Sequence, residues 1–172
     1  MPKGTSFTKI VRTRGFGARV VLEGELLSDR KPFTDETAAT EDLIFVHPYD
    51  DPDIVSGQGT IGLEIFEDIP DLDAIIVPIR GGGVIAGIAM ASKELNPKIE
   101  IIGVESQLYP SMYQAIHGLP PTSGGESIAE GIAVKVPGEI TKEIISRYVD
   151  DIILVDELSL ESASRPWSRP ES

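Results

Sequence analysis

Three features of this sequence predict an α/β fold. The expected fold is a three-layer αβα arrangement, a mostly parallel sheet with helices on both faces. Short apolar runs rich in β-branched residues occur at 74–79, 99–104 and 151–155, as expected for buried strands. Segments with apolar residues every three or four positions lie between them, at 84–95 and 137–148. Strands that alternate with helices in this way form right-handed βαβ units.

The segment from Asp73 to Leu95 is the centre of this pattern. Pro78 lies near the end of its strand, where no ladder donor is needed. Three glycines follow, and a helix is predicted from Val84. The residues expected on the inner face of this helix are Ile85, Ile88, Ala89 and Ser92. Because the first amides of a helix lack intrahelical acceptors and lie at its positive end, this turn predicts a cradle for phosphate or carboxylate.

The segments before this centre are predicted from weaker patterns. A helix is expected over 4–15, capped by Ser6 or Thr5, and a strand over 17–22. Residues 25–42 are acidic and are expected to form a loop, or a ragged helix over 35–41. A short apolar strand is predicted at 43–46, before a turn.

A helix is predicted over residues 54–68. Its expected inward residues are Ile54, Ile61, Ile65 and Phe66. Gly57 and Gly59 cost helix stability, roughly 1 kcal/mol each relative to Ala. Two interpretations of these glycines stay open. The first is close approach of backbone or of a ligand, and the second is ordinary tight packing.

The segments after the second strand complete the prediction. A short helix is expected over 109–117, ended by Gly118, and then a loop. Ser123 and Glu126 have capping-box spacing for a helix through Ala129, and 132–136 is strand-like. The helix over 137–148 is expected to present Ile140, Ile144, Ile145 and Tyr148 on one face. We therefore expect one α/β domain over 1–157, with a weak segment at 25–42, and a disordered or non-native tail over 158–172.

Composition restricts the class of protein. The chain has 172 residues and 41% apolar residues, enough for one sizeable core or two small lobes. The net charge of −13 argues against nucleic acid or an anionic membrane as a partner. Neither a membrane span nor an apolar leader is expected. Cysteine does not occur, which excludes thiolate chemistry and fits a cytoplasmic location.

Two kinds of ligand fit the glycine turn on sequence grounds alone. Gly81, Gly83 and Ala86 match G-x-G-x-x-A, and Glu105 follows the next strand, as in dinucleotide-binding folds. A run of adjacent glycines also suits a single phosphate held close to the main chain. From these residues alone both a dinucleotide and a phosphate ligand remain open.

Several motifs, in order along the chain, closely resemble threonine ammonia-lyases (threonine dehydratases) and serine racemases. The resemblance covers residues 1–24 and 43–157. The motifs that carry it are Phe45–Gly62, Val77–Gly87, Ile102–Glu105, Tyr109–Tyr113, Ala129–Val134 and Pro137–Thr141. It implies a partial fold-type II pyridoxal phosphate enzyme, tryptophan synthase β-like, of a lineage that removes water and ammonia from L-threonine or L-serine to leave a 2-oxo acid.

The resemblance also implies roles for particular residues. Gly81, Gly82, Gly83 and Val84 match the phosphate-binding loop, in which Arg80 replaces the first glycine. Gly131 matches a residue beside the cofactor ring. Glu105 matches a ligand of a divalent cation in some members, which the carbonyl of Tyr109 and the side chain of Ser111 would complete. At position 111 this chain has Ser where the family has an acid.

The sequence also departs from the family. It lacks the Ser-x-Lys-x-Arg-Gly motif, whose lysine binds the cofactor covalently, the Ser-x-Gly-Asn-His loop and the C-terminal serine that contacts the pyridine nitrogen. No catalytic residue is therefore assigned, pyridoxal phosphate is expected to bind non-covalently at most, and full lyase activity is not expected. Exposed apolar faces are expected to make the chain a homo-oligomer that binds a small phosphate ligand or an amino acid.

Two further alternatives are considered. A serine hydrolase would use Ser106, Ser111, Ser123 or Ser127 with His47 or His117, but no G-x-S-x-G elbow occurs. Asp50 and Asp51 are a possible carboxylate pair, for which a solvated turn is the simpler interpretation.

Overall fold

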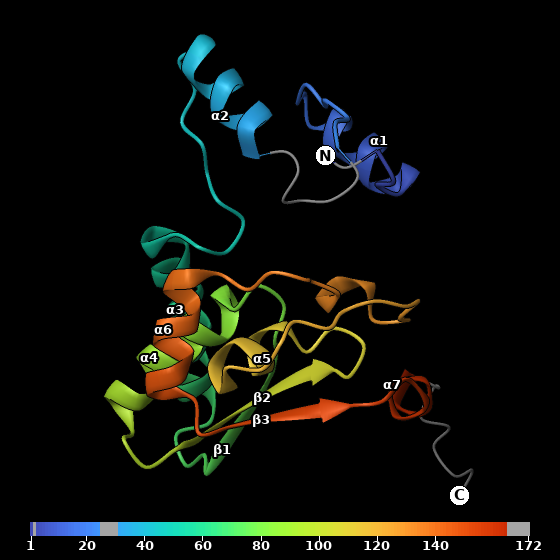
Figure 1. Cartoon of the computed structure of the whole chain (residues 1–172). Coiled ribbons are helices and arrows are strands. Elements are labelled where there is room, and N and C mark those ends of the chain that lie inside the picture. Colours follow the sequence, from blue (N-terminus) through green and yellow to red (C-terminus); the bar gives the residue numbers. More distant parts are fainter. Residues whose placement is uncertain (2, 25–30, 165–172) are drawn as a thin grey trace, which may run out of the picture. The chain divides into compact units, whose positions relative to one another are not determined.

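The computed structural model describes residues 1, 3–24 and 31–164. The chain divides into two compact units, Met1–Val46 and His47–Ser172 (Figure 1). This differs from the single domain over 1–157 that the sequence predicts. Part of the weak segment, 25–30, and the last eight positions of the expected tail lie outside the described residues.

The described residues of the first unit include the helices α1 (Phe7–Gly15) and α2 (Lys31–Thr40). The predicted helix over 4–15 is confirmed, although Ser6 at its N-cap makes no side-chain capping bond. The helix α2 begins earlier than the ragged helix expected at 35–41. None of the described residues of this unit is buried, so it has no apolar core among them.

Two strands predicted in this unit are wrong. Residues 17–22 form no strand. The backbone bonds of this stretch go to the first residues, such as Met1 N to Val21 O at 2.6 Å, and the side chain of Arg19 pairs with Glu41 of the segment after α2. The apolar run 43–46 is exposed along its whole length, with Ile44 at 92%. A strand requires a neighbouring strand that completes a ladder, and apolar composition alone does not supply one.

The second unit is built on the predicted parallel sheet, which is confirmed. Its strands are β1 (Ala74–Pro78), β2 (Glu100–Ser106) and β3 (Asp151–Val155), in the order β1-β2-β3. All neighbours are parallel. The carboxyl ends of the three strands therefore meet at one edge.

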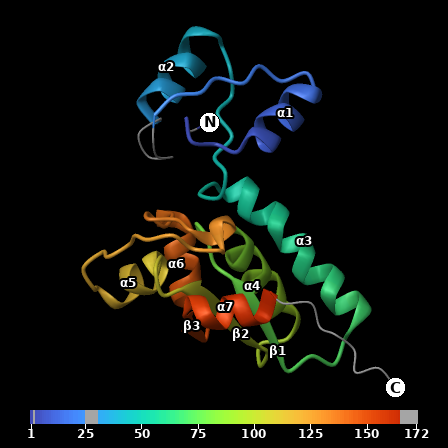
Figure 2. The ribbon, with the colours of Figure 1, turned by 90° about the vertical axis from the view of Figure 1, so that its right-hand side faces the viewer.

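Five α-helices and one short 3-10 helix accompany this sheet. They are α3 (Pro52–Asp68), α4 (Gly83–Leu95), α5 (Ser111–His117), η2 (Glu130–Ile132), α6 (Glu139–Tyr148) and α7 (Glu157–Ser164). Figure 2 shows α4 and α6 together on one side of the sheet, with α3 beside α4. None of the helices that the structure describes is both long and apolar enough to cross a bilayer.

The core lies between the sheet and α4. Buried residues of the strands, such as Ile75, Val77 and Ile101, pack in one cluster with Ile85 and Ile88 of α4. On the opposite face of the sheet Ile76 and Ile153 are 68% and 46% exposed. Within the described residues, one face of the sheet is thus covered and the other stays partly open.

The contact between α3 and α4 depends on small residues. A Cβ at Gly87 would lie 2.4 Å from the carbonyl oxygen of Val55, and one at Gly62 would lie 3.0 Å from Oγ of Ser92. Ile65 and Phe66 pack against the core as predicted, whereas Ile61 is 37% exposed. The inner face of α3 therefore includes Val55, Gly59 and Gly62 beside Ile65 and Phe66, and Ile61 is not part of it.

Three predictions near the C-terminus are corrected. The helix predicted from Ser123 is absent, because residues 119–129 are held as a loop by side chains, for example Tyr109 Oη to Gly125 O at 2.7 Å. The strand predicted at 132–136 is a turn, in which Val134 N donates to Ile132 O. The expected tail is helical at α7, where Asp156 Oδ1 accepts from Ser159 N at 2.7 Å.

Candidate functional site

The glycine turn joins β1 to α4 at the carboxyl edge of the sheet. Gly82 has φ +97°, a left-handed conformation that strains other residues, and it is the N-cap of α4. No side chain caps this helix. Its first amides therefore remain available to an anion, as the sequence predicts.

The glycines of the turn also permit close packing by distant side chains. A Cβ at Gly81 would lie 2.4 Å from the ring of Tyr49. One at Gly82 would lie 2.7 Å from both Met112 Cε and Thr141 Oγ1. The turn therefore needs glycine for tertiary packing as well as for any ligand.

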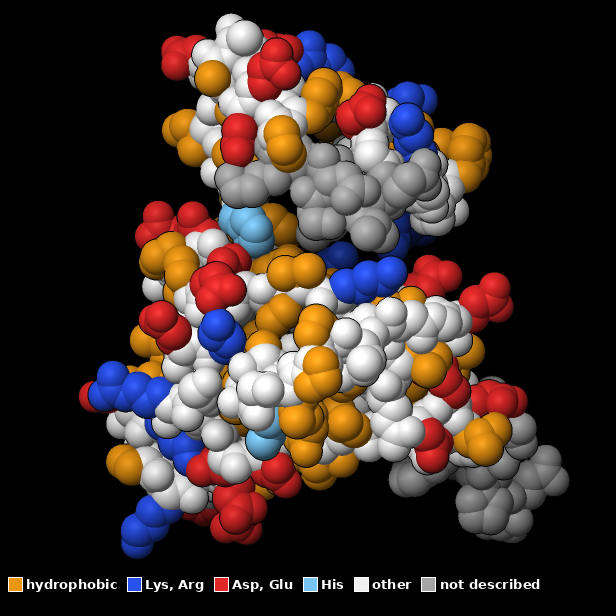
Figure 3. Space-filling model, in the orientation of Figure 1, with side chains coloured by type: hydrophobic (Ala, Val, Ile, Leu, Met, Phe, Trp, Pro, Cys, Tyr) orange, Lys and Arg blue, Asp and Glu red, His pale blue; other side chains and the backbone are white. Residues whose placement is uncertain are grey.

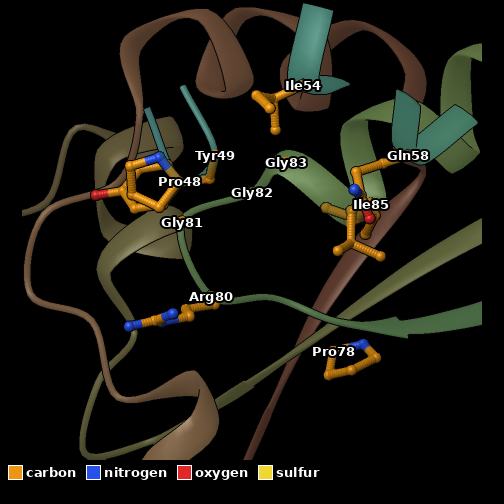
Figure 4. A pocket seen from close by; sticks show the side chains of 11 residues that line it. Pro48, Tyr49, Ile54, Gln58, Pro78, Arg80, Gly81, Gly82, Gly83 and Ile85 are labelled. Carbon is orange, nitrogen blue, oxygen red and sulfur yellow. The ribbon is translucent and has the colours of Figure 1, made fainter. Parts of the chain in front are cut away.

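A pocket of about 190 Å³ opens at this turn (Figure 4). It is lined by Pro48, Tyr49, Ile54, Gln58, Pro78 and residues 80–85. Among the described residues that line the pocket, Arg80 is the charged one and none is a carboxylate. Figure 4 shows the Arg80 side chain extending away from Gln58 and Ile85. In a chain with net charge −13, a pocket with a cationic lining residue favours an anionic ligand.

The same surroundings change the pKa of the Tyr49 phenol. Burial raises its pKa, and Asp50 raises it further, while the nearby Arg80 guanidinium opposes the shift. Tyr49 Oη donates to Val136 O at 3.2 Å. Tyr49 therefore remains a neutral hydrogen-bond donor that holds the chain before α6.

Asp50 connects this region to α6, a role that the sequence does not reveal. Its carboxylate accepts from Glu139 N, Ile140 N and Thr141 N at 2.9 to 3.2 Å. Thr141 Oγ1 in turn donates to Gly81 O at 2.7 Å. Asp50 is thus a helix cap of α6, neither part of a catalytic pair nor a solvated turn residue. The sequence indicates the start of α6 through Pro137-Gly138-Glu139, but it does not indicate that a residue about ninety positions earlier caps it.

Asp51 has a corresponding role at α3. Its Oδ1 accepts from Asp53 N at 2.9 Å and Ile54 N at 3.2 Å, and Pro52 stands in the first turn. His47 holds the preceding turn, because its Nδ1 accepts from Asp50 N at 2.7 Å. These polar residues between 47 and 53 therefore position backbone.

Glu105 lies at the end of β2 and is 1% exposed. Its two carboxylate oxygens accept from Met112 N at 2.9 Å and from Tyr113 N at 2.8 Å. Burial raises the pKa of Glu105, and these two amides partly offset that shift. A carboxylate engaged in this way is not available to a ribose hydroxyl, which removes the residue on which the dinucleotide reading depends.

The same geometry does not fit the cation site that the resemblance implies. Ser111 supplies a neutral hydroxyl, which is buried and has no hydrogen-bond partner. Among the described residues, no cluster of three or more His, Cys, Asp or Glu side chains is arranged to hold a metal ion. Calcium and magnesium sites in proteins are built mainly from carboxylates and carbonyls, and of the two side chains that the resemblance assigns to the cation, only that of Glu105 is an acid.

Gly131 lies in η2 and does not line the pocket. The structure thus brings Arg80, Gly81, Gly82, Gly83 and Val84 together and leaves Gly131 apart from them. Its predicted place beside a cofactor ring stays a prediction.

Two of the four serines of the hydrolase alternative share one carboxylate, and the hydroxyls of Ser111 and Ser123 have no hydrogen-bond partner in the described part of the chain. Ser106 Oγ and Ser127 Oγ both donate to Glu157 Oε1, at 2.9 and 2.8 Å, and Ile128 N donates to Oε2. His117 stacks on Tyr113. Glu157 therefore anchors the loop before η2, and no support for a serine nucleophile comes from these contacts.

An uncapped helix start behind a parallel strand, beside a pocket with a cationic lining residue, is typical of the class of α/β proteins that bind phosphorylated ligands. Comparison with known families makes this specific. Residues 1–169 match the family model described as pyridoxal-phosphate dependent enzyme. The chain belongs to this family.

Individual relatives agree with this assignment. The chain is 39% identical over 165 residues to an L-threonine ammonia-lyase of Thermotoga maritima, covering 95% of this chain and 41% of the relative. It is 46% identical over 159 residues to a catabolic L-threonine dehydratase of Escherichia coli K12, covering 91% and 48%. The chain thus spans about half the length of the curated relatives it matches.

Solved structures give the same result for the fold. Threonine deaminase isoform 2 of Solanum lycopersicum matches with a TM-score of 0.80 and 35% identity, covering 91% of this chain and 44% of that one. Maize serine racemase matches with a TM-score of 0.83 and 30% identity, covering 94% and 50%. The predicted resemblance to fold-type II pyridoxal phosphate enzymes is confirmed.

Proposed function

We propose that this chain carries the phosphate-binding part of a pyridoxal phosphate site of the threonine and serine ammonia-lyase type. The observation that carries the proposal is the pocket at the start of α4, lined by Arg80, Gly81, Gly82, Gly83 and Val84. Membership of the pyridoxal-phosphate dependent family and the names of the relatives support the cofactor and the substrate class.

The residues of the chain would act on the phosphate end of the cofactor. The first amides of α4 would donate to phosphate oxygens, and the Arg80 guanidinium would add a charge-assisted contact. When bound, pyridoxal phosphate supplies the electron sink that loss of water and ammonia from threonine or serine requires. Tyr49 and Thr141 would keep the turn in place through their contacts with Gly81.

Covalent attachment is not part of the proposal. Within the part of the chain that the structure describes, none of the residues that line the pocket is a lysine. Lys93, which lies in α4, is bound elsewhere, because its Nζ donates to both oxygens of Asp150 and to Ile99 O. We therefore expect non-covalent binding and little formation of 2-oxo acid by this chain alone.

Titration of the full chain with pyridoxal phosphate, followed by calorimetry, tests the proposal. We expect saturable binding that inorganic phosphate competes away, and no mass increase after borohydride reduction. Gly82→Ala should abolish binding, because it combines a positive φ with clashes at 2.7 Å. Gly124→Ala is the matched control, since no atom lies within 4 Å of its Cβ position.

Two results would contradict the proposal. A borohydride-stable adduct on a lysine would show that a covalent site exists. Binding of pyridoxal phosphate that Gly82→Ala leaves intact would place the ligand elsewhere. Saturable binding of NADH, without binding of pyridoxal phosphate, would support the dinucleotide alternative.

Two further expectations belong to this proposal. We infer that the chain forms homo-oligomers, which the exposed apolar residues of the open sheet face support. A cytoplasmic location also stays a prediction, which fractionation of cells that express the chain would check.

A further inference from the structure

Glu105 is one of the most enclosed charged groups among the described residues, and its place in the fold is specific. It ends the central strand, is 1% exposed, and accepts the backbone amides of Met112 and Tyr113 with both oxygens. A buried carboxylate is costly unless such donors surround it. The contact therefore fixes the position of the first turn of α5 relative to β2.

The first turn of α5 is itself packed against the glycine turn. Met112 is fully buried, and its Cε would lie 2.7 Å from a Cβ added at Gly82. Thr141 Oγ1 is equally close to that point and donates to Gly81 O. Gly82 thus lies between Met112 and Thr141, and any shift of α5 moves one of the two surfaces that confine it.

Among the described residues, the surroundings of Glu105 and Ser111 do not provide a set of ligands for a cation. Both oxygens of Glu105 already accept hydrogen bonds, and the hydroxyl of Ser111 brings no charge. A divalent ion would have to displace two amides from a buried carboxylate and then find further oxygen ligands. The two α5 amides therefore occupy the place that a cation would need.

We propose that Glu105 is a positioning residue for the phosphate-binding turn, acting through α5 and Met112, and that this contact works without a cation. The proposal concerns the turn on which the proposed function rests, and it deepens that function. Both of its tests are made without pyridoxal phosphate, so its failure and the failure of cofactor binding are distinguishable.

The first test is thermal unfolding of the full chain in EDTA and after addition of Mg²⁺, Ca²⁺ or Mn²⁺. A cation bound at a hundred times its dissociation constant would raise the melting temperature by roughly 5 to 10 °C. We expect a shift below about 1 °C for the natural chain, which is within the error of such measurements. A rise in the melting temperature of roughly 5 °C or more for the natural chain would overturn the proposal.

Ser111→Asp is the matched variant for this test. It restores a second carboxylate beside Glu105, and we expect it alone to acquire a cation-dependent rise in melting temperature. A variant that stays insensitive while the natural chain responds would show that the cation site uses other residues, which also overturns the proposal.

The second test is hydrogen exchange of backbone amides, measured by mass spectrometry on the full chain without ligand. Glu105→Gln leaves one α5 amide poorly paired, and we expect exchange to accelerate at least tenfold in α5 and in residues 81–85. Met112→Ala should accelerate residues 81–85 in the same way, because it removes the surface that confines Gly82 while Glu105 keeps its amides.

Asp150→Asn is the control for a general loss of stability. Asp150 precedes β3 at the amino edge of the sheet, where it accepts from Ile101 N at 2.7 Å and pairs with Lys93. We expect residues 81–85 to keep their exchange rates in this variant. Unchanged rates at the turn in Met112→Ala, or equal acceleration in Asp150→Asn, would refute the positioning role even if Glu105→Gln did not fold.

Discussion

Asp150 and Glu105 both accept backbone amides of the central region, yet their pKa values move in opposite directions. Burial works to raise the pKa of Asp150, but the amide of Ile101 and the ammonium of Lys93 outweigh it and lower the pKa. Burial dominates at Glu105 and raises the pKa. The difference follows from solvation, because Asp150 keeps 44% of its side-chain surface exposed and has a cationic partner.

This difference predicts a pH-dependent effect of Asp150→Asn. A carboxyl whose folded pKa lies below its unfolded value contributes stability above the unfolded pKa, near 3.9 for Asp, and loses it as the pH falls through the lowered folded value. We expect the variant to be less stable by roughly 1 kcal/mol at pH 7, a figure reduced for solvent screening. The gap to the natural chain should close at lower pH.

Urea unfolding between pH 7 and pH 3 measures this gap. Asp71→Asn, in an exposed loop, is a control with the same change of charge. A gap that persists unchanged at the acidic end would mean that Asp150 acts through shape and not through its charge.

At the scale of elements, the contact of α3 with α4 places two glycine-containing helix faces backbone to backbone. A Cβ added at Gly59 would lie 3.4 Å from the carbonyl oxygen of Gly87, and one at Gly62 would lie 3.2 Å from the carbonyl oxygen of Ile88. Gly57, in contrast, has no atom within 4 Å of its Cβ position. Close approach of the two helix backbones thus accounts for Gly59, because a Cβ at Gly87 would lie 2.6 Å from Gly59 N. It does not account for Gly57.

Alanine substitutions should separate these glycines. Gly57→Ala is expected to stabilise the protein by about 0.5 to 1 kcal/mol, because it improves helix propensity at an open position. Gly87→Ala should destabilise it by about 1 to 3 kcal/mol, since its Cβ would lie 2.4 Å from the carbonyl oxygen of Val55.

Denaturant unfolding of both variants measures the difference in free energy of unfolding. Destabilisation by Gly57→Ala comparable to that of Gly87→Ala would mean that Gly57 makes a contact absent from the described packing. The surface around Gly57 would then be the next place to look for a ligand.

At the scale of the whole molecule, strong negative charge coexists with exposed apolar surface. Figure 3 shows apolar side chains on the surface beside acidic ones. Ile76 and Ile153 project from the open face of the sheet in the unit His47–Ser172. Charge opposes association, and apolar burial favours it.

Self-association through this face is therefore expected to increase with salt, which screens the repulsion of a chain with net charge −13. Ile76→Glu should weaken association about tenfold or more, because it removes one large apolar contact and adds a charge. Sedimentation equilibrium at two ionic strengths measures both effects.

Leu158→Glu changes another exposed apolar residue, 75% exposed on α7, and is the control. Association that weakens equally in both variants, or a monomer at every salt concentration, would contradict a role for the sheet face.

Part of this molecule follows from local pattern alone. The three strands and the helices α4 and α6 were predicted close to their observed bounds, because apolar periodicity reflects which side of an element faces a core. The glycine turn and its anion preference were predicted for a similar reason, since a helix that opens after adjacent glycines exposes its amides wherever it occurs.

The folded chain was needed for the rest, and the reason is sequence distance. Residues 17–22, 43–46 and 132–136 have strand composition, but a strand exists only where a distant segment completes its ladder. The contacts of Tyr49 and Thr141 with Gly81 likewise join segments about thirty and sixty positions apart. Local patterns specify what an element prefers, whereas partners across the chain select which preferences are realised.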